Sequence, residues 1–134
     1  ISQLTKLDKY IKERNLIANY YKKKLNHKKI GFQELSKNFL CSYHLFVIKI
    51  LGKNNDKLRN RILFWLKKKK IYVGIHYYPV HLQLYYKKLG FHLGNYPNSE
   101  EYSDTAMSLP IYCGLKKKDL DFIIKNILKI INAK

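Results

Sequence analysis

The sequence predicts a single α/β or α+β domain with a small sheet and helices over one face of it. Segments of helical periodicity alternate with short β-branched and aromatic segments, in the order helix–strand–helix–strand–helix–helix–strand–helix. A length of 134 residues suits one domain, and a hydrophobic content of 46% is enough for a packed core. No internal repeat or linker interrupts the pattern, so we expect one domain over residues 1–134.

The first third of the chain predicts a helix, a loop and a strand. From Ser2 to about Asn26 the apolar residues recur every three or four positions, which indicates an amphipathic helix with Ser2 as N-cap. The chain opens directly on this helix, so we expect it to be part of something larger. NHKKIG breaks the helix, and the irregular stretch up to Ser42 predicts a loop. YHLFVIKIL (43–51) is typical of a strand.

The middle of the chain predicts a helix followed by a second strand. Asp56 is in position to cap a helix that runs to about Lys69. IYVGIHYY (71–78) indicates a strand that ends at Pro79, because proline cannot donate to a ladder. Gly74 within that strand predicts a bulge or a close approach of ligand or backbone.

The last third predicts two helices, a short strand and a closing helix. HLQLYYKKLG (81–90) predicts a short helix that ends on a left-handed glycine, Gly90. Asn98 or Ser99 is the expected N-cap of the next helix, with two glutamates in its first turn. An extended segment at 108–112 and an amphipathic helix at 119–131 complete the prediction.

Cysteine usage and hydropathy predict a reduced, cytoplasmic protein. Cys41 and Cys113 each lie beside an apolar run and form no disulfide framework. No apolar stretch approaches the length of a membrane helix, and the N-terminus has no signal-peptide hydrophobic region.

The net charge of +18 raises the question of nucleic acid. The basic residues are 24 Lys and only three Arg, whereas base-reading surfaces favour the bidentate arginine fork. Lysine runs at helix ends are more typical of solvated faces. We therefore keep a basic module that binds RNA or another polyanion as an alternative and do not expect nucleic acid as the main partner.

The segment VGIHYYPVHLQLYYKKLGF (73–91) gathers two His and four Tyr in one short run. A metal site is disfavoured, because His76, His81 and the later His92 have no carboxylate or thiol at ligand spacing. Two interpretations remain open from the residues alone. Either the rings fill a half-buried strand, or His76, Tyr77 and His81 surround the mouth of a pocket that holds a polar ligand.

The residues provide no complete catalytic set. Neither cysteine has a recognisable base and orienting group, and a small buried hydrophobe is the simpler interpretation of each. The nine Asp and Glu lie mostly at helix starts, where capping explains them. The scattered glycines form no phosphate-binding loop. We assign no catalytic and no metal-binding residue.

Four segments together resemble a known family. ISQLTKLDKYIKERNLIANYY, SYHLFVIKI, KKIYVGIHYYPVHLQLYYKKLGF and NYPNSEEYSDTAMSLPIYCGL are similar, in this order, to the C-terminal part of the DegT/DnrJ/EryC1/StrS aminotransferases. The H-Y-x-P-V-H-L-Q-x-Y-Y motif most resembles the subgroup that acts on UDP-4-keto-6-deoxy-N-acetyl-altrosamine in pseudaminic acid biosynthesis. The resemblance implies the C-terminal small domain of a fold-type I enzyme, with a small, mostly antiparallel sheet covered by helices.

The resemblance also implies a reaction and its partners. Family members transfer an amino group from glutamate, through pyridoxal 5'-phosphate, to a keto sugar on a nucleotide carrier such as UDP. Their Schiff-base lysine lies upstream of the Q-L-x-K-L-D helix in a large domain, and none of the 24 lysines here matches it. We therefore expect the large domain to be absent and the isolated chain to be inactive. It would be a truncated or split enzyme that forms a homodimer or joins a separate large domain, or else a decayed fragment.

The resemblance carries over few site residues. His76 and Tyr77 match the His-Tyr pair that helps to position the nucleotide sugar. His81 and Tyr85 match the ring-bearing positions that follow. His44 matches the His of the H-L-Y/F-V strand, where a structural role is an equally good interpretation. These five residues are the predicted substrate-binding set.

Overall fold

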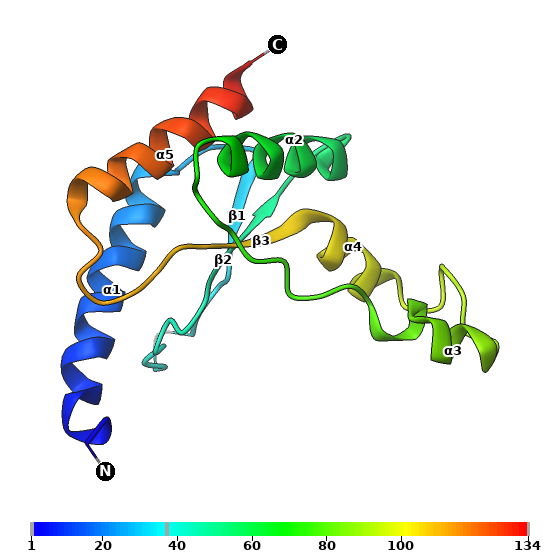
Figure 1. The fold of residues 1–134 in the computed structure, drawn as a ribbon, viewed down its shortest axis with the longest axis horizontal. Coiled ribbons are helices and arrows are strands. Elements are labelled where there is room, and N and C mark those ends of the chain that lie inside the picture. The colour runs from blue at the N-terminus through cyan, green and yellow to red at the C-terminus, as the bar shows by residue number, and fades with distance from the viewer. Residues whose placement is uncertain (1, 37, 134) are drawn as a thin grey trace.

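The computed structural model describes residues 2–36 and 38–133 and shows a three-stranded antiparallel sheet with helices packed against it (Figure 1). In chain order the elements are η1 (Leu4–Lys6), α1 (Leu7–Lys24), β1 (Ile30–Phe32), β2 (Phe46–Ile50), α2 (Asn55–Lys68), η2 (Val80–Leu82), α3 (Leu84–Lys88), α4 (Pro97–Thr105), β3 (Ala106–Leu109) and α5 (Lys117–Asn132). The α+β class predicted from the sequence is confirmed.

The sheet has the order β1-β2-β3, and β2 is its central strand. Ile30 pairs with Ile50 on one side, and Phe46 pairs with Leu109 on the other. Along β2 every second side chain is buried, which is the pattern of a strand with one face on the core. All four residues of β3 are buried. Side chains on both faces of β3 are therefore covered.

Three long helices close the core around this sheet. Tyr21 of α1 is fully buried and stacks on Phe46 of β2, with ring centroids 5.1 Å apart. Helices α2 and α5 lie side by side (Figure 1), joined by a hydrogen bond of 2.9 Å from Trp65 Nε1 to Asn126 Oδ1. The apolar positions expected at helical spacing thus do face the core.

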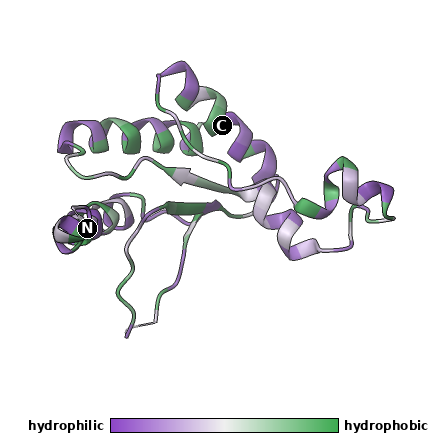
Figure 2. Cartoon of the chain, turned by 60° about the horizontal axis from the view of Figure 1, so that its bottom comes forward, coloured by the Kyte–Doolittle hydropathy of each residue, from purple (hydrophilic) through white to green (hydrophobic). Residues whose placement is uncertain are grey.

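A second part of the chain projects from the body, by which we mean the sheet together with α1, α2 and α5. Residues 75–96, which we call the arm, contain η2 and α3 and project away from the sheet before α4 leads back to β3 (Figure 1). Figure 2 shows hydrophobic residues on the arm although it stands clear of the body. Arg59 of α2 ties α4 to the body, because its Nε and Nη2 donate to the carbonyls of Asp104 and Ser103, each at 2.8 Å.

The predicted strand at 71–78 is wrong. Only Gly74 pairs with the sheet, through two backbone hydrogen bonds with Ser108 of 3.0 and 2.8 Å. The imidazole of His76 lies close to Gly74, and the chain then turns away from β3 into the arm (Figure 1). The alternation of apolar and ring residues therefore belongs to an extended, non-sheet segment.

The expected loop before Ser42 contains a strand, β1, that the sequence did not reveal. Three residues centred on Gly31 are too short to show an alternation. Most helices are confirmed to within a few residues, and Gly90 has the predicted left-handed conformation with φ of 96°.

The predicted N-caps are wrong. Helix α2 begins before Asp56, with Asn54 as a cap whose side chain makes no capping hydrogen bond. Helix α4 begins at Pro97, ahead of Asn98 and Ser99, because proline is well suited to a first helical position. At the start of the chain Ser2 makes no side-chain cap, and Gln3 precedes a turn of 3-10 helix.

Within residues 2–36 and 38–133, no helix combines the length and the apolar character that crossing a membrane requires. The same residues contain no group of three or more His, Cys, Asp or Glu close enough to hold a metal ion.

Candidate functional site

The arm carries four of the five predicted site residues and much of the exposed apolar surface of the chain. Its exposed large hydrophobic residues are Ile75, Tyr77, Tyr78, Val80, Leu84, Tyr85, Tyr86, Leu89, Leu93 and Tyr96. A run of this kind on a projecting segment is typical of a surface that meets a ligand or another protein surface.

His76 is fixed at the root of the arm. Its Nδ1 lies 3.0 Å from the hydroxyl of Ser108, whose backbone pairs with Gly74. A Cβ at Gly74 would lie 2.4 Å from His76 Cε1, so glycine is required for this approach. Because one ring nitrogen is engaged by Ser108, the other nitrogen, Nε2, is left to exchange a hydrogen bond with a ligand.

Tyr77 lies directly beside this imidazole. The two rings meet edge to face with centroids 4.8 Å apart, and the peptide bond between His76 and Tyr77 is cis. The Tyr77 side chain is 74% exposed, which leaves its hydroxyl accessible to a ligand. In the structure, the imidazole of His76 is therefore fixed by Ser108, and the phenol of Tyr77 beside it is exposed.

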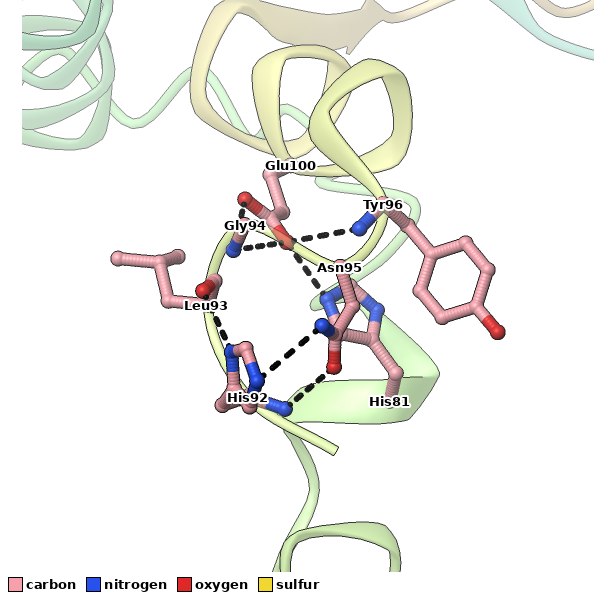
Figure 3. A network of polar contacts seen from close by, with 7 residues as sticks. All are labelled: His81, His92, Leu93, Gly94, Asn95, Tyr96 and Glu100. Atoms are coloured by element: carbon pink, nitrogen blue, oxygen red, sulfur yellow. Dashed lines mark hydrogen bonds and ion pairs between the residues drawn. The ribbon is translucent and has the colours of Figure 1, made fainter. Parts of the chain in front are cut away.

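His81 has a different environment. It is buried, and its Nε2 lies 2.8 Å from Oε1 of Glu100 (Figure 3). Its ring also packs on Tyr96, with centroids 4.8 Å apart. The same Glu100 oxygen accepts hydrogen bonds from the backbone N–H groups of Gly94 and Tyr96. His81 thus faces the carboxylate of Glu100 on α4 and not open solvent.

Sequence reasoning gave Glu100 only a place in the first turn of α4 and missed its partners. Partial burial by itself would raise the pKa of this carboxyl, but the hydrogen bonds from His81, Gly94 and Tyr96 bring it below its ordinary value. Glu100 is therefore an ionised acceptor at neutral pH. Nineteen residues separate it from His81, and no local pattern in the sequence links the two.

A cavity of about 340 Å³ opens on the arm beside His81. Its lining consists of Val80, His81, Tyr86, Phe91, Tyr96 and Ser99. The Phe91 ring centroid is 6.2 Å from the centroids of both Tyr86 and Tyr96, so three aromatic rings border one space. Such a lining suits a flat or apolar group with polar edges.

The remaining two predicted residues, Tyr85 and His44, do not line the arm cavity. Tyr85 is 68% exposed on α3, packed edge to face on Tyr86. His44 is exposed and precedes β2, whose first residue pairs with Leu109 at the end of β3. Among the described residues, no hydrogen bond or ring contact joins His44 to any of the other four predicted residues.

The described residues do not fit a pyridoxal phosphate site of their own. A Schiff-base lysine must lie in a desolvated pocket that lowers its pKa, and no lysine within residues 2–36 and 38–133 is buried. We derive no chemical step through this cofactor within the chain.

Comparison with known proteins gives a family and a fold. A model described as the DegT/DnrJ/EryC1/StrS aminotransferase family matches residues 1–128. The uncharacterized protein MJ1066 of Methanocaldococcus jannaschii is 30% identical over 137 residues, which cover 98% of this chain and 35% of that protein.

Solved structures agree with this match. The putative sugar aminotransferase Spr1654 of Streptococcus pneumoniae superposes with a TM-score of 0.87 at 26% identity, covering 96% of this chain and 32% of that one. It is known in apo, PMP and PLP forms. PseC of Helicobacter pylori, an aminotransferase of pseudaminic acid biosynthesis, gives 0.85 at 23% identity, covering 96% and 34%, and so shows the fold alone. The chain spans about a third of the length of these relatives.

Proposed function

Because the chain belongs to the DegT/DnrJ/EryC1/StrS aminotransferase family, we propose that it is the carboxy-terminal part of a transaminase for nucleotide-linked sugars. In this proposal the arm covers the sugar nucleotide, while the pyridoxal phosphate and its lysine belong to residues outside these 134. The single observation that carries it is the pairing of His76, held by Ser108 at 3.0 Å, with the exposed Tyr77.

The role of each residue follows from its contacts. His76 presents Nε2 to a hydroxyl or phosphoryl oxygen, because Ser108 already engages Nδ1. Tyr77 offers a phenolic O–H from an exposed position beside it. These groups bind and orient the substrate, and neither acts as nucleophile. His81 supports the arm from within, and Tyr85 and His44 are proposed as outer contacts.

The proposed reaction moves an amino group from glutamate to a UDP-linked 4-keto-6-deoxy sugar, in pseudaminic acid or related amino-sugar biosynthesis. The H-Y-x-P-V-H-L-Q-x-Y-Y motif supports this choice of substrate. We place the protein in the cytoplasm. The exposed apolar residues of the arm favour an assembly in which they are covered, as a homodimer or together with a separate large domain.

The test is a chimera in which this chain replaces the matching third of Spr1654, assayed with glutamate and a UDP-linked keto sugar. We expect transamination by the chimera, and none by the 134-residue chain alone. Tyr77→Phe should raise KM for the sugar nucleotide, because the phenolic donor is lost. Tyr72→Phe is the matched control, since Tyr72 is 75% exposed and lies outside the arm. Equal kinetics for the two variants would overturn the assignment of Tyr77.

A second candidate is binding of RNA or another polyanion. It is favoured by a cavity of about 350 Å³ whose lining includes Lys29, Lys53, Lys57 and Arg61. Binding that weakens with salt, is lost on replacing Lys53 and Lys57 with Gln, and survives His76→Ala would favour this candidate.

A further inference from the structure

Glu100 joins segments of the arm that are far apart in the chain. Oε1 lies 2.8 Å from His81 Nε2 and accepts the Gly94 and Tyr96 backbone N–H groups at 2.9 and 3.3 Å (Figure 3). Oε2 also accepts from Gly94, at 3.0 Å. One carboxylate on α4 therefore holds both η2, on the outgoing side of the arm, and the loop on its return.

The other polar contacts in Figure 3 do not make this connection. The His92 backbone N–H donates to Asn95 Oδ1 at 2.8 Å, and the His92 ring contacts the Leu93 carbonyl and Asn95 Nδ2. These bonds stiffen the loop internally. The polar contacts from Glu100 are the ones that tie the loop to η2.

The carboxylate of Glu100 is shielded from water, which strengthens its hydrogen bonds. The side chains of His81 and Glu100 are only 8% and 12% exposed, so water competes weakly for either partner. Hydrogen bonds to an ionised acceptor are about twice as strong as neutral ones. The ring of His81 also packs on Tyr96, which adds a contact between η2 and the loop, and Tyr86 and Phe91 extend this ring packing to α3.

We infer that Glu100 is the positioning residue of the arm: its carboxylate holds His81 and the loop at Gly94–Tyr96 together and so keeps the aromatic cavity formed. A consequence, which rests on the proposed function, is that Glu100 also sets the shape of the aromatic cavity that the arm presents to a sugar nucleotide. Glu100 itself touches no substrate in this scheme.

Hydrogen exchange on the ligand-free chain tests the inference. Glu100→Ala should speed exchange of the Gly94 and Tyr96 amides roughly tenfold or more, because both lose their acceptor. The amides of β2 and β3 should keep wild-type rates. The matched control is Glu101→Ala, whose side chain is 56% exposed and makes an ion pair of 3.2 Å with Lys49. Gly94 and Tyr96 amides that exchange at the wild-type rate in Glu100→Ala would overturn the inference.

Glu100→Gln keeps the test decisive if the alanine variant fails to fold. It retains one acceptor oxygen but cannot be ionised, so protection of the Gly94 and Tyr96 amides should lose the pH dependence that Glu100 gives it. A protection profile against pH that matches the wild type would contradict the inference.

The chimera separates this inference from the proposed function. Glu100→Ala in the chimera should raise KM for the sugar nucleotide with little change in kcat. If exchange rises but KM is unchanged, Glu100 positions the arm and the proposed role of the arm in binding is wrong. If exchange is unchanged, Glu100 does not position the arm, whatever the kinetics.

Discussion

The body and the arm of this chain are held together in different ways. In the body, Tyr21, Ile48 and Ile62 are completely buried around a three-stranded sheet. In the arm, Leu84 is 80% exposed and Tyr77 is 74% exposed, and a carboxylate connects the outgoing and returning segments. Burial stabilises the body, whereas polar contacts shape the arm. The arm is therefore the part whose geometry a ligand or partner can change.

The largest effect is expected from truncating the body. Ile48→Ala removes a fully buried side chain from the central strand and should lower the free energy of unfolding by about 2–5 kcal/mol. Leu84→Ala on the arm should change it by less than about 0.5 kcal/mol, because that side chain is already in water. Urea unfolding of the two variants measures both values. Equal losses would mean that the arm packs as firmly as the body.

A smaller loss is expected at the junction between the two regions. Arg59→Ala removes two hydrogen bonds that join α2 to the end of α4 and should cost about 1.5–3 kcal/mol. Arg61→Ala is the matched control, since Arg61 is exposed on the same helix. Thermal unfolding compares them, and a similar change in Tm for both would show that the Arg59 contacts contribute little.

At the root of the arm the expected change is smaller still. Gly74→Ala places a Cβ 2.4 Å from His76 Cε1, and the imidazole, which is the far end of its side chain, must move away from its place beside Ser108. We expect a stability loss of about 1 kcal/mol, at the low end of overpacking costs. The His76 ring signals in NMR spectra should shift, since the contact with Ser108 changes. Unchanged ring signals would mean that His76 is not held as described.

The smallest and most local effect concerns pH. Hydrogen bonds to Glu100 bring its pKa below the ordinary value, so its contribution to the arm is complete above the ordinary carboxyl range. That contribution is lost as the pH falls through the lowered pKa. Amide protection at Gly94 and Tyr96 should decline in acid before that of β2 does. Loss of protection in both places at the same pH would show that the arm and body open as one unit.

The same contrast explains what the sequence could predict. Helices α1, α2 and α5 and strand β2 belong to the body, where burial of one face imposes a periodicity. The segment 71–78 has a similar pattern, but its rings serve the root of the arm, and the predicted strand is wrong. The pairing of His81 with Glu100 leaves no periodic signal, because a hydrogen bond between distant residues depends on the tertiary fold.

The residues of the candidate site also divide into those that a sequence motif reveals and those that only the tertiary structure reveals. His76 and Tyr77 could be selected from their motif, and the structure places them in contact. Ser108 and Glu100, which orient the rings, lie 32 and 19 residues from their partners and could not be selected. That these residues bind a sugar nucleotide stays a prediction.

Because Ser108 belongs to β3, the contact between its hydroxyl and His76 depends on the register of that strand. Its backbone lies between Val47 of β2 and Gly74, while its hydroxyl meets His76. A slip of one residue would bring the thioether of Met107 or the aliphatic side chain of Leu109 to the imidazole. All four positions of β3 are buried, so a slipped strand would still place its side chains in the interior. A misregistered molecule could thus be compact and yet lack a correctly oriented His76.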